Sequence, residues 1–203
     1  EISVCLVGSE MCIRDRQLGN PAPHFSLKST DEKIISLGNF DSKFLVIFFT
    51  CNHCPYVIGS DEVTRTSADK FIDKSVSFVA INSNSENTYK EDSFENMVLR
   101  MQENNFPWIY LHDTDQSVAL NYGALKTPHF YIFNMQRKLV YTGRGVDSPL
   151  DSKKIKVNNL DLALDELTSN TLISIPITNP IGCSVKWEGK DSHWVPPEAC
   201  DLV

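Results

Sequence analysis

The distribution of apolar residues along the chain predicts alternating strands and helices. Two short strand-like segments, 24–29 and 33–37, flank the turn residues TDE and predict a hairpin. The run FLVIFFT at 44–50 is apolar almost throughout, which is typical of a strand buried on both faces of a sheet. Residues 52–74 carry a broken apolar stripe, so we expect a helix there, with Pro55 tolerated in its first turn.

The same alternation continues to about residue 168. Apolar segments predict further strands at 75–82, 108–112, 129–133 and 138–143. Helical spacing predicts helices at 94–105, 115–123 and 158–167. Asp92 or Ser93 is expected to cap the first of these. The resulting order, β-β-β-α-β-α-β-α-β-β-α, predicts an α/β protein with a central mixed sheet flanked by helices.

Both ends of the chain depart from this pattern. Residues 1–16, EISVCLVGSEMCIRDR, show no strand or helix periodicity and resemble translated adaptor sequence. We therefore expect them to be non-native or a disordered N-terminus. Residues 170–203 are rich in proline and turn residues, which predicts a C-terminal extension that either packs on the domain or stays mobile. Residues 17–169 are expected to form one domain.

Composition and charge exclude some classes of function. The chain has 203 residues, of which 41% are hydrophobic and 22% charged, as in ordinary globular proteins. Its formal net charge of −7 argues against nucleic-acid binding, because no basic stripe is available to neutralise phosphates. No segment reaches the roughly 18 apolar residues that a membrane span needs. We expect a soluble protein and favour the cytoplasm, but the compartment stays open because residues 1–16 obscure any native targeting signal.

The candidate chemistry lies in TCNHCPY at 50–56, between the buried strand and the following helix. We expect Cys51 at the helix N-terminus, where unpaired N–H groups and the helix dipole lower a thiol pKa from about 8.5. Cys51 is therefore the predicted nucleophile. Cys54, three residues on, is the predicted resolving thiol, more buried and less reactive. His53 adds a cation that would stabilise the reduced form and make the pair more oxidising.

Three features together give the chain a family resemblance. They are the CxxC motif after a buried strand, TPHFYIF at 127–133, and GCSVKW at 182–187. Over roughly residues 18–187 the chain resembles the thioredoxin-like superfamily. Within it, the chain is similar to the redoxin grouping of alkyl hydroperoxide reductases and thiol-specific antioxidant proteins (AhpC/TSA). The resemblance implies a thioredoxin-like fold and thiol–disulfide oxidoreductase activity in redox homeostasis. The substrates would be protein or small-molecule disulfides, a redox partner would regenerate the CxxC pair, and no cofactor is implied.

The resemblance also assigns residues around the cysteines. Pro128 would be a cis-proline that shapes the substrate groove, and Thr127 would offer backbone groups to an incoming peptide in strand-like pairing. Thioredoxins have Trp, Gly and Pro where this chain has Thr50, Asn52 and His53, and they carry a buried acid on the preceding strand, which 44–50 lacks. The residues expected to line the groove and tune the thiolate are Thr50, Asn52, His53, Pro55, Thr127 and Pro128. A histidine before the second cysteine resembles the oxidising members of the superfamily.

Two alternative functions stay open at this point. A peroxiredoxin-like thiol peroxidase would need Thr three residues before its Cys-Pro and Arg near the downstream proline, but here Cys51 takes the first place and the second offers only Lys126. A copper or zinc carrier could use Cys51, Cys54 and His129, since thiolates and imidazole suit these metals. Cys183 is either a third thiol near the site or a small buried anchor of the tail, and the anchor is favoured.

Overall fold

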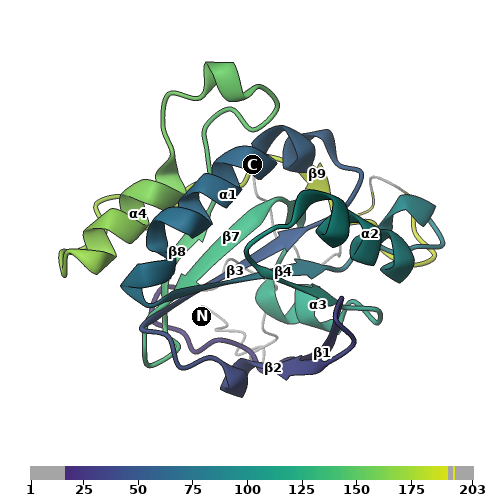
Figure 1. The fold of residues 1–203 in the computed structure, drawn as a ribbon, viewed down its shortest axis with the longest axis horizontal. Helices are drawn as coiled ribbons and strands as arrows, with labels where there is room; N and C mark the ends of the chain where they lie inside the picture. Colours follow the sequence, from purple (N-terminus) through teal and green to yellow (C-terminus); the bar gives the residue numbers. More distant parts are fainter. Residues whose placement is uncertain (1–16, 192–193, 195–203) are drawn as a thin grey trace, which may run out of the picture.

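The computed structural model describes residues 17–191 and 194, so the prediction for residues 1–16 lies outside it. Its elements follow the predicted order (Figure 1). The strands of the main sheet are β1 (Ser26–Ser29), β2 (Ile34–Ser36), β3 (Phe44–Thr50), β4 (Val76–Asn82), β5 (Ile109–His112), β7 (His129–Phe133) and β8 (Leu139–Gly143). The helices are α1 (Pro55–Phe71), α2 (Phe94–Asn104), α3 (Ser117–Tyr122) and α4 (Asn159–Thr168).

The main sheet has seven strands in the order β2-β1-β5-β4-β3-β7-β8. β3 pairs in parallel with β4 and antiparallel with β7, which makes the sheet mixed, as predicted. Every residue of β3 is buried, as expected for a strand with a neighbour on each side and a covered layer on each face. The CxxC motif follows the C-terminal end of β3 and therefore lies at an interior strand of the sheet.

The two faces of the sheet form separate cores because side chains alternate along each strand. Val46 and Phe48 of β3 point into the core that α1, α2 and α4 cover. Leu45, Ile47 and Phe49 point into the core that α3 closes on the other face. Burying strands on both faces fixes the register of β3, because a slip of one residue would exchange the two sets of side chains.

Helix α1 begins later than the sequence pattern suggested. It begins at Pro55 rather than at residue 52, and its N-cap is Cys54, which has extended backbone angles (φ −66°, ψ 124°). Proline is favoured at this first helical position because its missing N–H has no intrahelical partner there in any case. At the other end, Ile72–Lys74 form a separate 3₁₀ turn after α1. Cys54, and not Cys51, therefore lies at the helix N-terminus.

The other caps explain how the second helix is placed. The side chain of Ser93 accepts a hydrogen bond from the backbone N–H of Asn96 and so caps α2. Asp92, the other predicted cap, belongs to a 3₁₀ turn (Lys90–Asp92) and is fully buried. Its carboxylate is thereby left to make other contacts.

The described part of the C-terminal extension packs on the domain. Val185 and Trp187 are buried in the same core as α3. A two-residue strand β9 (Cys183–Ser184) pairs antiparallel with an equally short β6 (Lys126–Thr127), separate from the main sheet. Strands of two residues carry too little alternation to be predicted from sequence. Among the residues that the structure describes, no helix combines the length and apolarity needed to cross a membrane.

Candidate active site

The two thiols of the CxxC motif lie side by side beneath the Thr127–Pro128 peptide. Cys51 directly follows β3, and its Sγ atom is 3.6 Å from Thr127 Oγ1. The protonated thiol of Cys54 can donate to the carbonyl oxygen of Thr127 at 3.3 Å. The Thr127–Pro128 bond is cis, as predicted. Both sulfur-bearing residues have 0% of their surface exposed, so Cys54 is not the more buried of the two.

Burial and hydrogen bonding shift the pKa values of the two thiols in opposite directions. Burial, a hydrogen bond to Cys54 and the charge of Asp92 raise the pKa of Cys51 well above its usual range. Hydrogen bonds to the sulfur of Cys54, first from Cys51 and then from Cys183 and the backbone N–H of Val57, outweigh burial and lower its pKa to about 5. The lowered pKa thus falls on Cys54, the N-cap of α1, and not on Cys51, where the sequence pattern placed it. The assignment of Cys51 as the nucleophile stays a prediction.

This charge distribution predicts a titration at low pH. The ultraviolet absorbance of a thiolate should appear as the pH rises through about 5 and should persist at neutral pH. Cys51→Ala removes the first hydrogen-bond donor to the Cys54 sulfur, so the midpoint should move to higher pH. Cys51→Ser keeps a hydroxyl donor and is the matched control, with a smaller shift. An unchanged midpoint in Cys51→Ala would show that Cys51 does not stabilise the thiolate.

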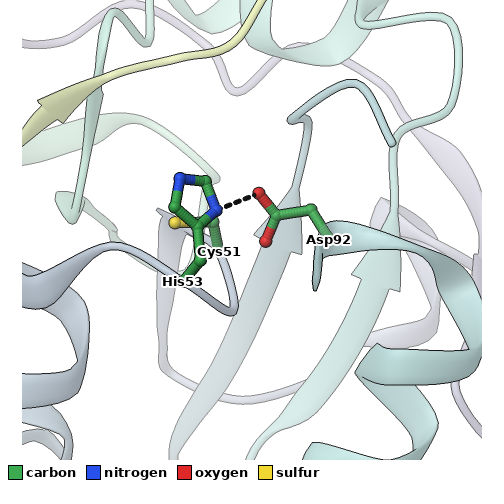
Figure 2. Close-up of side chains that lie close together, drawn as sticks. All are labelled: Cys51, His53 and Asp92. Atoms are coloured by element: carbon green, nitrogen blue, oxygen red, sulfur yellow. Dashed lines mark hydrogen bonds and ion pairs between the residues drawn. The ribbon is translucent and has the colours of Figure 1, made fainter. Parts of the chain in front are cut away.

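A buried carboxylate organises the loop between the cysteines. Asp92 accepts hydrogen bonds from the backbone N–H of Asn52 at 2.6 Å, from His53 Nδ1 at 2.7 Å and from Asn84 Nδ2 at 2.7 Å. Figure 2 shows the carboxylate facing the imidazole, with the sulfur of Cys51 behind the ring. The side chain of Asp92 is 0% exposed. A buried acid is thus present beside the thiols, although it comes from the β4–α2 connection and not from β3.

Asn52 is a positioning residue for the same loop. Its side-chain amide donates to the carbonyl oxygen of Glu91 at 2.8 Å, and its side-chain oxygen accepts from the hydroxyl of Tyr110 at 2.9 Å. These contacts, with the backbone bond to Asp92, join the CxxC loop to two other segments of the chain. An asparagine at this place therefore holds the loop by hydrogen bonds that a glycine could not make.

His53 contacts both the buried acid Asp92, through a ring nitrogen, and an aromatic ring. Its ring stacks on Tyr89 with centroids 4.1 Å apart and an angle of 8° between the planes. Burial opposes protonation of His53, but the hydrogen bond and charge of Asp92 outweigh it, so the pKa of His53 is raised. The predicted cation beside the thiols is thus supported by a specific partner that stabilises its charge.

The alternative metal site that includes His129 is not formed. The ring nitrogens of His129 are both engaged elsewhere, Nε2 with Thr142 Oγ1 and Nδ1 with the hydroxyl of Tyr131, each at 3.1 Å. Burial lowers the pKa of His129 to about 3, so the ring is neutral and satisfied. A different set of potential ligand atoms, from Cys51, His53 and Asp92, lies within 4.8 Å of one another. In the structure, His53 Nδ1 is occupied by its bond to Asp92.

The remaining predicted residues fall into two groups. Thr50 ends β3 opposite Asn82 of β4, and Pro55 begins α1. Thr127 does not offer a free backbone edge to an incoming peptide, because β9 of the same chain already pairs with it. Cys183 lies on β9, is partly exposed and packs against the two buried cysteines. The favoured interpretation had Cys183 buried, whereas its side chain is partly exposed.

Three residues of the site carry no recognisable sequence signal. Asp92 has the pattern of a helix cap, while Asn84 and Tyr89 belong to a polar connection without a motif. Asp92 and Tyr89 contact residues 52–53, more than 30 positions earlier in the chain, and Asn84 donates to Asp92. The histidine between the two cysteines suggests that an acidic partner exists. The sequence does not show which acid it is, because only the fold brings Asp92 to His53.

Comparisons with known proteins agree with this architecture. The sequence model of the Redoxin family matches residues 17–162. The search of curated proteins found no match. A solved structure described as an uncharacterized conserved protein from Geobacillus kaustophilus is 38% identical, with a TM-score of 0.81. That likeness covers 86% of this chain and 94% of the Geobacillus chain.

Two other solved structures extend the comparison. A hypothetical protein from Sinorhizobium meliloti 1021 is 30% identical with a TM-score of 0.81, covering 86% of this chain and 97% of that chain. The thioredoxin domain of a thiol-disulfide oxidoreductase from Bacteroides vulgatus is 17% identical with a TM-score of 0.57. That likeness covers 66% of this chain and 94% of the Bacteroides chain. At this low identity the likeness concerns the fold alone, and it shows that the fold is thioredoxin-like.

Proposed function

The chain belongs to the Redoxin family, and from that premise we propose that it is a thiol–disulfide oxidoreductase whose redox pair is Cys51 and Cys54. The observation that carries the proposal is the contact of both sulfurs with Thr127 of the cis Thr127–Pro128 peptide, together with a lowered pKa at Cys54. A thiolate adjacent to a second thiol is the arrangement that disulfide exchange needs, because one sulfur attacks and the other resolves the mixed disulfide.

In the proposed order, Cys51 attacks a disulfide and Cys54 resolves the resulting mixed disulfide. Because the pKa is lowered at Cys54 and raised at Cys51, the proton of Cys51 first moves to Cys54, so that the pair titrates as a unit. A disulfide then forms between the two cysteines, and the substrate leaves as two thiols. The proposed substrates are small-molecule and protein disulfides.

Counting thiols tests this function. The purified protein should expose two fewer thiols to a denaturing thiol reagent after mild oxidation, and a reductant should restore both. Bound zinc and copper should be measured on the same sample, because Cys51, His53 and Asp92 could also hold a metal. Stoichiometric metal together with cysteines that never form a disulfide would replace the redox function with metal binding.

We expect His53 to set the reduction potential of the pair. A protonated imidazole stabilises the thiolate and hence the reduced form, so His53→Ala should lower the reduction potential, on the order of 30 mV for about 1.4 kcal/mol of lost stabilisation. Asp92 raises the pKa of His53, so the imidazole is charged below that pKa and neutral above it. The difference between variant and wild type should therefore be larger at pH 6 than at pH 8.

The exposed His24 offers a matched control for this prediction, because His24→Ala removes an imidazole on the surface. It should leave the potential unchanged at both pH values. A His53→Ala potential equal to that of the wild type at the lower pH would contradict the role of His53.

A thiol peroxidase is the second candidate, and the lowered pKa of Cys54 favours it. Cys54 is followed by Pro55 at the start of a helix, and a thiolate is the form of cysteine that peroxide oxidises. The hydroxyl of Thr127 approaches Cys51 and not Cys54, and residue 126 is a lysine. We expect dilute hydrogen peroxide to oxidise the pair no faster than it oxidises a free thiolate. Much faster oxidation that is lost in Cys54→Ser would make the peroxidase the main activity.

A further inference from the structure

The chain's own C-terminal extension occupies the backbone edge next to the cis-proline. Cys183 is paired opposite Thr127, and Ser184 opposite Lys126, in antiparallel register. The backbone N–H of Val185 continues the contact by donating to the carbonyl oxygen of Leu125 at 3.1 Å. Residues 183–185 thus lie where a substrate strand would pair, and they place a cysteine beside the redox pair.

This segment is a fixed part of the fold. A Cβ atom on Gly182 would lie 2.1 Å from the carbonyl oxygen of Thr127, so the close approach requires glycine at this position. Beyond the cysteine, Val185 and Trp187 are 1% and 5% exposed. The carbonyl oxygen of Lys186 also accepts a hydrogen bond from the backbone N–H of Ser85 at 2.8 Å. The core and the backbone together hold Cys183 in place.

Cys183 packs against the buried cluster that contains Cys51 and Cys54. The three cysteines form a row in which Cys54 influences the pKa of both of the others. Cys51 and Cys54 have no exposed surface, whereas Cys183 is partly exposed. Among the residues that the structure describes, Cys183 is therefore the thiol of this row that solvent reaches.

We propose that Cys183 is a third redox thiol, which takes over the disulfide from the buried pair and presents it at the protein surface. The proposal rests on the proposed function of Cys51 and Cys54. The Cys183 sulfur attacks the Cys54 sulfur of the Cys51–Cys54 disulfide. The Cys54–Cys183 bond forms, the Cys51–Cys54 bond breaks, and the bonding electron pair and the proton of Cys183 go to Cys51, which becomes a free thiol. The step is an isomerisation that consumes no oxidant.

The pKa of Cys183 should differ between the reduced and the oxidised site. In the reduced site, burial and then the hydrogen bond and charge of Cys54 raise the pKa of Cys183 to about 12, so it is protonated and unreactive. Formation of the Cys51–Cys54 disulfide removes the charge on Cys54 and with it part of that increase. Cys183 thus becomes a better nucleophile only when there is a disulfide to attack.

The same arrangement favours regeneration from outside. An external dithiol attacks the exposed Cys183 sulfur of the Cys54–Cys183 disulfide, and Cys54 leaves as a thiolate. A thiol of low pKa is a good leaving group, which suits the position of Cys54 between two donors. The second thiol of the dithiol then frees Cys183, and the dithiol departs as its own disulfide.

Disulfide mapping tests the proposal on the full chain. The reduced protein is treated with one equivalent of diamide, free thiols are alkylated, and the tryptic peptides are analysed by mass spectrometry. Cys51 and Cys54 share peptide 44–65, whereas Cys183 lies in peptide 157–186. We expect a crosslink between these two peptides in the wild type, with alkylated Cys51. The crosslink should remain in Cys51→Ser and be lost in Cys54→Ser, while Ser184→Ala, on the same strand, should behave as the wild type.

The outcomes separate the two proposals. If the wild type holds only the disulfide within peptide 44–65 and Cys51→Ser forms no crosslink, Cys183 is not a redox thiol, although the proposed function stands. If none of these cysteines forms a disulfide, the proposed function fails as well. A crosslink that persists in Cys54→Ser would show that Cys183 pairs with Cys51 and would overturn the proposed row.

Discussion

Cys54→Ser is expected to reduce catalysed turnover of a small disulfide substrate to the background rate. Without the second sulfur, a mixed disulfide on Cys51 cannot be resolved inside the site, so the variant should accumulate a covalent adduct with the substrate. The thiolate absorbance at low pH should disappear as well, because Cys54 carries the resting charge. Both readouts, turnover by an absorbance assay and adduct by mass spectrometry, follow from the same lost sulfur.

This variant should keep its fold. Cys54 is the N-cap of α1, and serine is among the residues preferred at that position. Cys200→Ser, the same substitution at a cysteine outside the motif, serves as the matched control and should turn over substrate like the wild type. Full activity of Cys54→Ser would show that Cys54 takes no part in the reaction.

Asp92→Ala is expected to have the largest effect on stability. The side chain of Asp92 is fully buried and accepts three hydrogen bonds, from Asn52, His53 and Asn84. Removing one partner of a buried charged network costs about 3 to 5 kcal/mol, because the other polar groups stay buried without partners. Denaturant unfolding should show this loss, and the pKa of His53, no longer raised by Asp92, should fall.

Two other variants separate charge from hydrogen bonding at this position. Asp92→Asn keeps one acceptor oxygen but loses the charge, so it should lie between the wild type and Asp92→Ala in stability. Glu91→Ala changes an exposed neighbouring acid and should leave stability within the small range of surface substitutions, about 0.5 kcal/mol. An Asp92→Ala protein as stable as Glu91→Ala would mean that the network holds little of the loop's structure.

Most of the fold could be predicted because its signals are local. The run 44–50 is apolar almost throughout and is a central strand, and the helix at 115–123 ends at Gly123, which has the positive φ of 67° that such a cap needs. The start of α1 was misplaced because residues 52–54 are compatible with a helix by composition. Only the geometry of Cys54 before Pro55 shows where the helix begins.

The site was predictable in its residue types but not in its electrostatics. The sequence located both cysteines, His53 and the Thr127–Pro128 peptide, because their spacing and context are characteristic. It could not locate the charge, since the pKa of Cys54 depends on donors from residues 51, 57 and 183, which only the fold brings together. For the same reason the sequence left two interpretations of Cys183 open, a third thiol near the site or an anchor of the tail.

The central claim, a reversible disulfide centred on Cys54, is tested most directly by equilibrating the protein in glutathione buffers of graded potential and counting its free thiols. We predict a single two-electron transition. Its midpoint should lie above the value of about −270 mV that is typical of thioredoxin, because His53 stabilises the reduced form. A protein whose Cys51, Cys54 and Cys183 remain free thiols across the whole range would contradict the account.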